Sequence, residues 1–565
     1  MRFRAASGPS SNGRGNWPRS TASASCRRQG SRPGCSRTMR RAGWRDAAGS
    51  GDDDRSGGKH AMTALTRLSD VYRLRDPAWA ERPAVRLGAG VLSFAALDRL
   101  TNRIAQALIR DGIAPGTRVA ILDKNGLLYP ALVGGILKAG AVVLPVNFRL
   151  AADEVAFTLD DGAAALVFVG PEHGGPDHGA LAAGLSCRAV EVAGLDAWLG
   201  TVPDTDPDLP GAGDGDVVQL YTSGTTGRPK GVCHLDRAFC ALIGTFARHV
   251  ALPAAGEEMM VLVPLFHMAG FDLMTFALAQ GIGVVLQRDF DAAAALQAVA
   301  GGIGALVAVP AIIQMLVEAQ ARAGADLSPL RRIFYGASAI PEPLLARALA
   351  VMGGVEFIQC YGMSETNIIT VLQPADHGER GLLAACGRVL PGCAVRIADA
   401  AGNEVAPGEI GEITVRAPWL MHRYWRRPEA TAETFRDGWL LTGDAGSVDG
   451  RGYLFIRDRL KDLIITGAEN VYPAEVERVL VEHPAVAEVA VFGVPDTRWG
   501  EAVRAAVVLR PAGAATEAEI LDFMAGRIAR YKLPKSVAFV AALPRNAAGK
   551  VLKFRLRQDW LEANS

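Results

Sequence analysis

The chain has 565 residues, of which 49% are hydrophobic and 21% are charged. A chain of that length exceeds the size at which one hydrophobic core keeps growing, so we expect at least two domains, and its composition excludes disorder throughout. Residues 1–60 carry thirteen Lys or Arg and four Asp, so the remaining residues carry −8 of the total charge of +1. An acidic main body gives no electrostatic reason to expect nucleic acid as a partner.

The first 61 residues differ from the rest of the chain. They are rich in Arg, Ser and Gly, contain no acidic side chain before Asp46 and show no hydrophobic periodicity, which predicts a disordered leader. They resemble either an organellar transit peptide or upstream sequence translated from a start placed too early, and we favour the second because an ordinary domain opens at Met62. The eight cysteines form no CxxC pair, and no apolar run reaches membrane-spanning length, so we expect a reduced, cytoplasmic protein.

From Met62 onward, helical and strand patterns alternate. Ser93 is placed to cap an amphipathic helix that runs to about Asp111. The strand pattern RVAIL, a helix over about 128–138 and the apolar run AVVLP follow in that order. Further strand patterns lie at 165–170, 217–221, 283–286 and 305–310. The alternation predicts an α/β fold in which helices protect both faces of a sheet.

After about Val395 the pattern changes. The short segments AVRIAD, GEITVRA and GYLFIRD, separated by turn signals, predict a β-rich subdomain. The last hundred residues have a pattern of their own, with helices over about 473–481 and 517–528 and strands at VAEVAVFGV and AVRAAVVL. We therefore predict a large N-terminal domain over 62–458, a connection at 459–462 and a small C-terminal α+β domain over 463–565.

Residues 221–231 read YTSGTTGRPKG and directly follow the strand pattern VVQLY. A loop at the carboxyl end of a strand can meet a ligand, its glycines let backbone N–H groups approach closely, and its hydroxyls add donors. With a lysine as the cation, this is the chemistry of a phosphate-binding loop, although a linker or hairpin is the alternative. It is not a Walker loop, because the lysine precedes a glycine and Pro229 prevents the same helix start. The candidate residues are Thr222, Ser223, Gly224, Thr225, Thr226 and Lys230.

Three further motifs follow this loop: QCYGMSETN at 359–367, LLTGDAGSVDGRGYLFIRDRLKDLIITGAENVYPAEVE at 440–477 and LPRNAAGKVLK at 543–553. In sequence, order and spacing the four motifs closely resemble those of the adenylate-forming superfamily, which includes acyl-CoA synthetases, aryl-CoA ligases, nonribosomal adenylation domains and luciferase. The stretches ARYKLPK and ENVYPAEVE are most similar to fatty acyl-CoA ligases. The resemblance implies that a carboxylic acid reacts with ATP to give acyl-AMP, that coenzyme A then displaces AMP, and that Mg²⁺ is required.

The resemblance assigns the first step to residues of these motifs. It implies that the Lys550 ammonium bridges the substrate carboxylate and the α-phosphate, where like charges would otherwise repel. Glu365 is implied as the Mg²⁺ ligand and Thr366 as a hydroxyl donor to the α-phosphate. Tyr361, beside Gly362, is implied to lie against the adenine ring. The ordinary alternatives are a solvated side chain for Lys550 and Glu365 and core packing for Tyr361.

The resemblance also assigns the ribose contacts and the second step. Asp444 is implied to accept hydrogen bonds from the ribose hydroxyls, and Arg459 is implied as a second ribose or phosphate contact, although a turn residue is the alternative for Asp444. Lys461 is the implied hinge about which the mobile C-terminal domain rotates to move Lys550 out of the site. The loop over 466–470 is then implied to meet the pantetheine arm of coenzyme A, and its candidate residues are Gly467, Glu469 and Asn470.

His267, in PLFHMAG, lies where acyl- and aryl-CoA ligases of the superfamily have a histidine near the acyl tunnel. Amino-acid-activating relatives usually have an aspartate there, so the histidine argues against an amino acid substrate, although Asp272 is close enough for a shifted alignment to restore one. Gly336, Ala337 and Ser338 are implied to edge the adenine and acyl pockets. A structural role is the alternative for each of these residues.

We therefore expect an acid–thiol ligase that converts a medium or long aliphatic acid to its coenzyme A thioester. An aryl-CoA ligase and an enzyme that loads a carrier protein instead of coenzyme A are both left open, as is a homodimer. A non-catalytic nucleotide-binding protein is the alternative from another class. The presence of Lys550, Glu365 and Asp444 together counts against it, because a pure binder has little need of all three.

Overall fold

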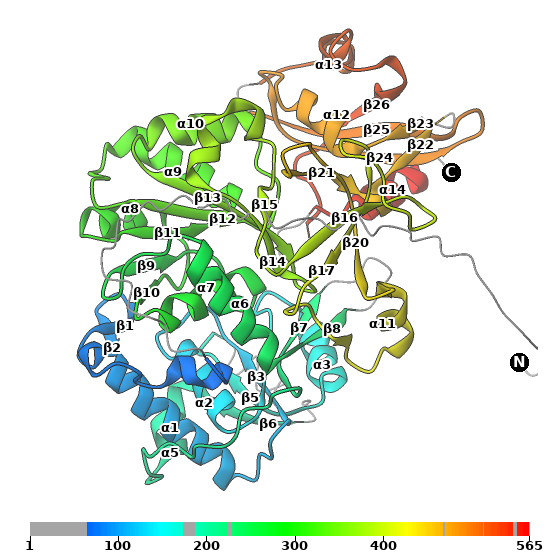
Figure 1. Ribbon diagram of the computed structural model, residues 1–565. Coiled ribbons are helices and arrows are strands. Elements are labelled where there is room, and N and C mark those ends of the chain that lie inside the picture. Colours follow the sequence, from blue (N-terminus) through cyan, green and yellow to red (C-terminus); the bar gives the residue numbers. More distant parts are fainter. Residues whose placement is uncertain are drawn as a thin grey trace, which may run out of the picture. The chain divides into compact units, whose positions relative to one another are not determined.

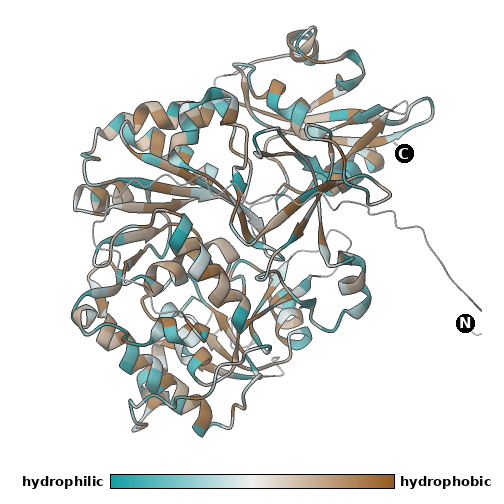
Figure 2. Cartoon of the chain, in the orientation of Figure 1, coloured by the Kyte–Doolittle hydropathy of each residue, from teal (hydrophilic) through white to brown (hydrophobic). Residues whose placement is uncertain are grey.

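The computed structural model describes residues 65–172, 187–222, 229–466, 469–511, 513–545 and 551–563. Within these residues the strands form four sheets, and helices pack on them (Figure 1). Apolar residues follow the strands and the inner sides of the helices, as the brown segments in Figure 2 show. The helices are α1 (Phe94–Arg110), α2 (Tyr129–Lys138), α3 (Ala152–Asp161), α5 (Leu195–Leu199), α6 (Asp236–His249), α7 (Met268–Ala279), α8 (Ala292–Ala300), α9 (Pro310–Ala323), α10 (Glu342–Val351), α11 (Pro428–Thr434), α12 (Pro473–Leu480), α13 (Glu517–Met524) and α14 (Lys553–Ala563).

The first sheet has nine strands in the order β15-β14-β13-β12-β11-β9-β10-β1-β2. The strands from β13 to β1 in this order are parallel to their neighbours, and antiparallel strands close both edges. Their bounds are β1 (Pro83–Leu87), β2 (Gly90–Ser93), β9 (Glu258–Val261), β10 (Gly283–Leu286), β11 (Ala305–Ala308), β12 (Arg332–Gly336), β13 (Glu356–Met363), β14 (Asn367–Leu372) and β15 (Arg388–Val389).

The second sheet has seven strands in the order β18-β8-β7-β4-β3-β5-β6. Its strands from β7 to β6 are parallel to one another, whereas β8 is antiparallel to β7 and β18 is antiparallel to β8. The bounds are β3 (Arg118–Leu122), β4 (Val142–Pro145), β5 (Ala164–Val169), β6 (Arg188–Glu191), β7 (Asp216–Thr222), β8 (Lys230–Leu235) and β18 (Arg423–Tyr424).

Helices cover both faces of these two sheets. The largest apolar cluster joins residues of both sheets with α1, α2, α6 and α7, and α7 is buried along its whole length apart from Ala269. Apart from Asp272 and Thr275 its residues are apolar, because the helix has no solvent-facing side. On the other face of the first sheet lie α8, α9 and α10, and α3 covers the other face of the second. The predicted α/β architecture is therefore confirmed.

The β-rich part forms the third sheet, in which β16, β17, β20 and β19 are adjacent in that order and β21 pairs with β20. Its strands are all antiparallel and enclose a small apolar cluster. The bounds are β16 (Ala394–Ala398), β17 (Gly411–Arg416), β19 (Phe435–Arg436), β20 (Trp439–Val448) and β21 (Leu454–Arg459).

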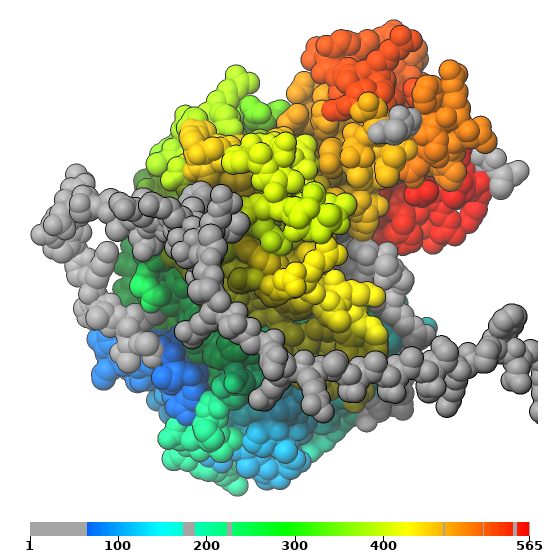
Figure 3. Space-filling model, turned by 45° about the vertical axis from the view of Figure 1, so that its right-hand side comes forward, coloured from blue at the N-terminus to red at the C-terminus, as the bar shows by residue number. Residues whose placement is uncertain are grey.

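The C-terminal residues form the fourth sheet, in the order β23-β22-β25-β24 with β26 parallel to β25. An apolar cluster on one face includes α12 and α13, and a second cluster on the other face includes α14. Figure 3 shows these residues, coloured orange to red, as one closely packed body. The bounds are β22 (Ile464–Thr466), β23 (Glu469–Val471), β24 (Val486–Asp496), β25 (Gly500–Leu509) and β26 (Ser536–Phe539).

Local sequence signals explain where several elements begin and end. The Ser93 hydroxyl caps α1 by accepting a hydrogen bond from the Ala96 N–H at 3.2 Å, as predicted. Two expectations were wrong at their ends. The strand expected over 305–310 ends at Ala308, because Pro310 has no N–H and begins α9 instead. The helix expected to reach residue 528 ends at Met524, close to Gly526, which has a φ of 75°.

Among the described residues, no helix combines the length and apolar character needed to cross a bilayer.

Candidate active site

The candidate site lies where strands of the first three sheets meet. β7 and β13 end at Thr222 and Met363, and carboxyl ends of parallel strands are where ligands bind in α/β sheets. Val232 of β8, Tyr361 of β13 and Leu440 of β20 belong to one apolar cluster, so the three sheets pack against each other at this point. The site is therefore assembled from residues far apart in the sequence.

The hydroxyl-rich loop connects β7 and β8. Thr222 and Lys230 are partners across this hairpin, so they stand at the two ends of the loop. The Lys230 ammonium lies 5.0 Å from the centroid of the Tyr424 ring, a cation–π distance. Six predicted site residues lie outside the described residues, and their roles stay predictions: Ser223, Gly224, Thr225, Thr226, Gly467 and Lys550.

Tyr361, Asp444 and Arg459 form a hydrogen-bonded chain. The Tyr361 phenol donates to Asp444 Oδ2 at 2.7 Å, and Arg459 Nε pairs with Asp444 Oδ1 at 2.6 Å. Asp444 and Arg459 face each other because they are register partners on β20 and β21. Burial and the nearby Asp444 carboxylate raise the pKa of Tyr361 well above its usual value. The Asp444 carboxylate is thus fixed by Tyr361 on one oxygen and by Arg459 on the other.

Glu365 lies in the turn between β13 and β14 and is 7% exposed. Its Oε1 accepts a hydrogen bond from the Tyr424 phenol at 2.9 Å. Burial raises the pKa of Glu365, and the Tyr424 hydrogen bond and the Arg459 charge act against that rise, whereas the Asp444 charge adds to it. Glu365 therefore shares one electrostatic environment with Asp444 and Arg459.

The same turn carries two hydroxyls, those of Thr366 and Ser364, of which the sequence analysis considered only Thr366. Thr366 is fully buried, and its hydroxyl accepts from the Met363 N–H at 3.0 Å and donates to the Asn367 carbonyl at 2.9 Å. In this structure the Thr366 hydroxyl hydrogen is used inside the turn, and the expected role of Thr366 as donor to the α-phosphate stays a prediction. Ser364 in the same turn is only partly buried and is therefore the more exposed of these two residues.

A buried histidine supports this turn from behind and was not singled out from the sequence. His234 Nε2 lies 2.7 Å from the Ser364 carbonyl, and its Nδ1 lies 3.3 Å from Asn367 Nδ2, which makes Nε2 the protonated nitrogen. Complete burial lowers the pKa of His234 to about 4, so the ring is neutral at pH 7. Asn367 has a φ of 51°, a left-handed conformation that asparagine tolerates, and its side chain also donates to the Trp419 carbonyl at 3.0 Å.

Two glycines allow neighbouring backbone segments to lie close together at the carboxyl ends of these strands. A Cβ on Gly336 would lie 2.1 Å from the Cys360 carbonyl oxygen, and a Cβ on Gly362 would lie 1.8 Å from the Asn367 carbonyl oxygen. Ala337 follows with a φ of 64°. The glycines are therefore needed for the path of the chain, and a role in edging the adenine and acyl pockets stays a prediction for Gly336, Ala337 and Ser338.

His267 and Asp272 lie at the start of α7. The half-buried His267 ring packs against Phe266 with their centroids 4.2 Å apart, and desolvation together with the Arg149 charge lowers its pKa to about 4. Asp272 is 1% exposed, and neither of its oxygens has a hydrogen-bond partner among the described residues. Burial raises the pKa of Asp272 well above its usual value. A neutral imidazole beside an aromatic ring suits the wall of an apolar pocket.

The connection to the C-terminal residues is short. The turn Leu460–Asp462, a single 3₁₀ turn, follows β21, and Lys461 on it is exposed. One carboxylate links both sides of this turn, because Asp458 accepts from the Arg459 N–H at 2.7 Å and from the Ala474 N–H of α12 at 2.6 Å. Beyond the turn, the exposed Glu469 and Asn470 lie on β23 opposite Thr466 and Ile465. A rotation about Lys461 stays a prediction.

The donor set fits Mg²⁺ in one respect. Among the described residues, no group of three His, Cys, Asp or Glu side chains could hold a metal ion. Glu365 has one oxygen bonded to Tyr424 and the other without a side-chain partner in the part of the chain that the structure describes. Mg²⁺ bound to a nucleotide keeps phosphate and water ligands and needs only one or two carboxylates, so Glu365 can serve as its protein ligand.

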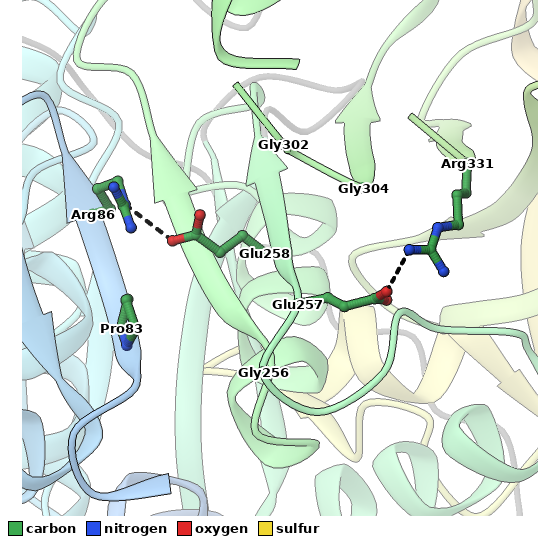
Figure 4. A pocket seen from close by; sticks show the side chains of 8 residues that line it. All are labelled: Pro83, Arg86, Gly256, Glu257, Glu258, Gly302, Gly304 and Arg331. Atoms are coloured by element: carbon green, nitrogen blue, oxygen red, sulfur yellow. Dashed lines mark hydrogen bonds and ion pairs between the residues drawn. The ribbon is translucent and has the colours of Figure 1, made fainter. Parts of the chain in front are cut away.

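A cavity of about 360 Å³ lies at the other end of the strands of the first sheet, near the amino ends of β9, β11 and β12 (Figure 4). Its charged side chains are already paired, because Arg86 contacts Glu258 at 3.0 Å and Arg331 contacts Glu257 at 2.8 Å. None of the predicted site residues lines it. We therefore do not assign a ligand to this cavity.

Comparison with known proteins agrees with this geometry. The family model of the AMP-binding enzymes matches residues 75–425, and the model of the C-terminal domain of AMP-binding enzymes matches residues 475–550. A fatty acid–[acyl-carrier-protein] ligase, ScoC of Streptomyces coeruleorubidus, is 41% identical over 88% of this chain and 97% of its own length. A feruloyl-CoA synthase of an Amycolatopsis species is 40% identical over 84% of this chain and 96% of its own length.

A solved structure, that of ATP-bound MatB from Rhodopseudomonas palustris, superposes with a TM-score of 0.80 at 31% identity. The superposition covers 88% of this chain and 99% of the MatB chain. The chain therefore belongs to the AMP-binding enzyme family of adenylate-forming enzymes, and its class is that of the AMP-forming acid–thiol ligases.

Proposed function

We propose that this enzyme is an ATP- and Mg²⁺-dependent ligase that converts a medium or long aliphatic carboxylic acid to its coenzyme A thioester through an acyl-AMP intermediate. One observation carries the proposal: Glu365, Asp444 and Arg459 share one electrostatic environment, and Tyr424 contacts both Glu365 and Lys230, which ends the hydroxyl-rich loop. A carboxylate for ribose hydroxyls and a second carboxylate for a metal are what an adenylating site needs.

In the first step, a carboxylate oxygen of the acid attacks the α-phosphorus of ATP, the bond to the bridging oxygen breaks and pyrophosphate leaves. Asp444 accepts hydrogen bonds from the ribose hydroxyls while Arg459 fixes its orientation, and Tyr361 flanks the adenine. Ser364 takes the place given to Thr366 in the sequence analysis and donates its hydroxyl to the α-phosphate. Bound Mg²⁺ neutralises phosphate charge. The Lys550 ammonium stabilises the two anions as they approach.

In the second step, the thiol sulfur attacks the carbonyl carbon of acyl-AMP, AMP leaves and the thiol proton is lost. A rotation about Lys461 withdraws Lys550 and brings the loop over 466–470, with Glu469 and Asn470, to the pantetheine arm. Two exposed residues on a short edge strand are suited to such a contact, because they need no rearrangement of a core. The neutral His267 contributes to the wall of the acyl site.

A panel of acids tests the proposal. Purified enzyme is given ATP and Mg²⁺ with alkanoic acids of 4 to about 18 carbons, with benzoates and with cinnamates, and AMP release is measured with and without coenzyme A. We expect acid- and coenzyme A-dependent AMP release that is greatest for an alkanoic acid. Release confined to benzoates or cinnamates would contradict the aliphatic assignment, and no acid-dependent turnover would contradict the function as a whole.

Two alternatives have specific support. The 41% identical relative ScoC is named for a carrier-protein acceptor, and the 40% identical relative is named for an aromatic acid. The same panel separates them if a phosphopantetheinylated carrier protein is offered in place of coenzyme A. A thioester formed on the carrier but not on coenzyme A would move the acceptor assignment to the carrier.

A further inference from the structure

Tyr424 is the one described side chain for which the structure records contacts with both Lys230 and Glu365. It is 8% exposed, its phenol donates to Glu365 Oε1 at 2.9 Å, and its ring lies 5.0 Å from the Lys230 ammonium. Lys230 stands at the end of the hydroxyl-rich loop, and Glu365 lies in the turn after β13. Two groups expected to contact the nucleotide therefore rest on one aromatic side chain.

The backbone around Tyr424 is held to the same two elements. Tyr424 is the register partner of Val232 on β8, two residues beyond Lys230. Three residues before Tyr424, the Met421 N–H donates to the Glu365 carbonyl at 2.8 Å. On the far side, the Trp425 N–H donates to the Gly231 carbonyl at 2.7 Å. The segment from 421 to 425 thus joins the β7–β8 hairpin to the β13–β14 turn, and Tyr424 cannot shift without moving one of them.

The phenol and the ring of Tyr424 act on different partners. The hydrogen bond occupies Oε1 of Glu365 and leaves the other carboxylate oxygen without a side-chain partner among the described residues, so it fixes the rotamer without blocking a metal. The ring faces Lys230 and needs no hydroxyl for that contact. Removing the hydroxyl alone should therefore loosen Glu365 and leave Lys230 in place.

We propose that Tyr424 is a positioning residue that holds the Glu365 carboxylate ready for the metal–nucleotide complex and, through its ring, holds Lys230 beside it. The proposal rests on the proposed function, because it takes Glu365 as the protein ligand of the metal. Tyr424 itself touches no reacting atom. Because Tyr424 already restricts the side chains of Glu365 and Lys230, these side chains lose less conformational entropy when the nucleotide binds.

The structure supplies a matched control. Tyr453 is 5% exposed, and its phenol donates to Asp376 Oδ1 at 2.7 Å, which is the same type of bond, to a carboxylate that is partly buried. Asp376 lies in the 3₁₀ segment Pro374–Gly378, which contains none of the predicted site residues. Tyr424→Phe and Tyr453→Phe therefore each remove one phenol–carboxylate hydrogen bond, and only the first one touches the candidate site.

Calorimetric binding of α,β-methylene-ATP to the full chain, without acid or coenzyme A, measures this effect without turnover. For Tyr424→Phe we expect affinity with Mg²⁺ to fall about tenfold, as for a lost hydrogen bond to a charged group, and affinity in EDTA to stay within about twofold. Tyr424→Leu should also weaken binding in EDTA by about two- to fivefold, because Lys230 loses the ring. Tyr453→Phe should bind as wild type under both conditions.

Three results would overturn the inference. They are binding of the Mg²⁺ complex by Tyr424→Phe as by wild type, an equal loss of affinity with and without Mg²⁺, and an equal loss in Tyr453→Phe. Thermal unfolding of the two phenylalanine variants shows whether both are folded, and similar midpoints would exclude general destabilisation. If wild-type enzyme binds no adenine nucleotide, the proposed function fails too, and that outcome is distinct from the other three.

Discussion

The buried carboxyl of Asp272 should make the protein less stable as pH rises. Asp272 is 1% exposed on α7, both of its oxygens lack partners among the described residues, and burial raises its pKa well above the usual value. In the unfolded chain an aspartate has a pKa of about 3.9. Above that pH the unfolded state releases its proton while the folded state keeps it, so ionisation favours unfolding. Below about pH 3.9 both states are protonated, and the effect disappears.

Asp272→Asn removes this ionisation and keeps the shape of the side chain. The unfolding free energy of Asp272→Asn minus that of wild type should increase by about 1.4 kcal/mol per pH unit. This increase should extend from the pKa of aspartate in the unfolded chain to the raised pKa of Asp272 in the folded protein. Urea unfolding followed by tryptophan fluorescence at pH 5, 6, 7 and 8 measures it. A pH-independent difference, or a loss of stability that grows with pH, would refute the reasoning.

Asp236→Asn is the matched control for that experiment. Asp236 is 2% exposed, and burial raises its pKa too, but its two oxygens accept hydrogen bonds from the Leu68 N–H at 2.6 Å and the Ala212 N–H at 2.8 Å. An amide offers only one acceptor oxygen and turns an NH₂ group toward one of these donors. Asp236→Asn should therefore destabilise the protein by about 1–3 kcal/mol, the opposite sign to Asp272→Asn.

Three further predictions concern the site. Lys550→Ala should abolish acid-dependent pyrophosphate release but leave most thioester formation from supplied acyl-AMP, and equal loss of both activities would remove Lys550 from its proposed role. Lys461→Pro should keep pyrophosphate release near wild type and slow thioester formation by at least about tenfold, because proline restricts the backbone of the turn; normal rates in both assays would discredit the hinge. Ser364→Ala should slow pyrophosphate release about tenfold with an unchanged unfolding midpoint, whereas Thr366→Val should mainly lower that midpoint, and the reverse pattern would restore Thr366 as the phosphate donor.

The sequence predicted the elements well because their signals are local. The Ser93 cap placed α1 within one residue at each end, and the periodic segments placed most strands of the parallel sheets. Errors occurred where one residue decides an end, as at Pro310 and Gly526. The domain boundaries at 458 and 462 stay predictions, although Asp458 and the 3₁₀ turn after it lie at the expected connection.

The site was harder to predict, since its contacts join distant residues. The resemblance named Tyr361 and Asp444 separately, but their hydrogen bond spans 83 positions in the chain and appears only in the structure. The choice between Ser364 and Thr366 depends on how one turn directs its side chains, which motif spacing does not encode. Tyr424 lies outside the four motifs, and its partners are 59 or more positions away in the chain.

A structure of the full chain bound to a non-hydrolysable acyl-adenylate, such as a dodecanoyl sulfamoyl adenosine, tests the central claim most directly. The account predicts ribose hydroxyls within hydrogen-bond distance of Asp444, adenine against Tyr361 and the sulfamoyl group beside Ser364. An adenosine bound elsewhere, with Asp444 still paired only to Tyr361 and Arg459, would contradict it.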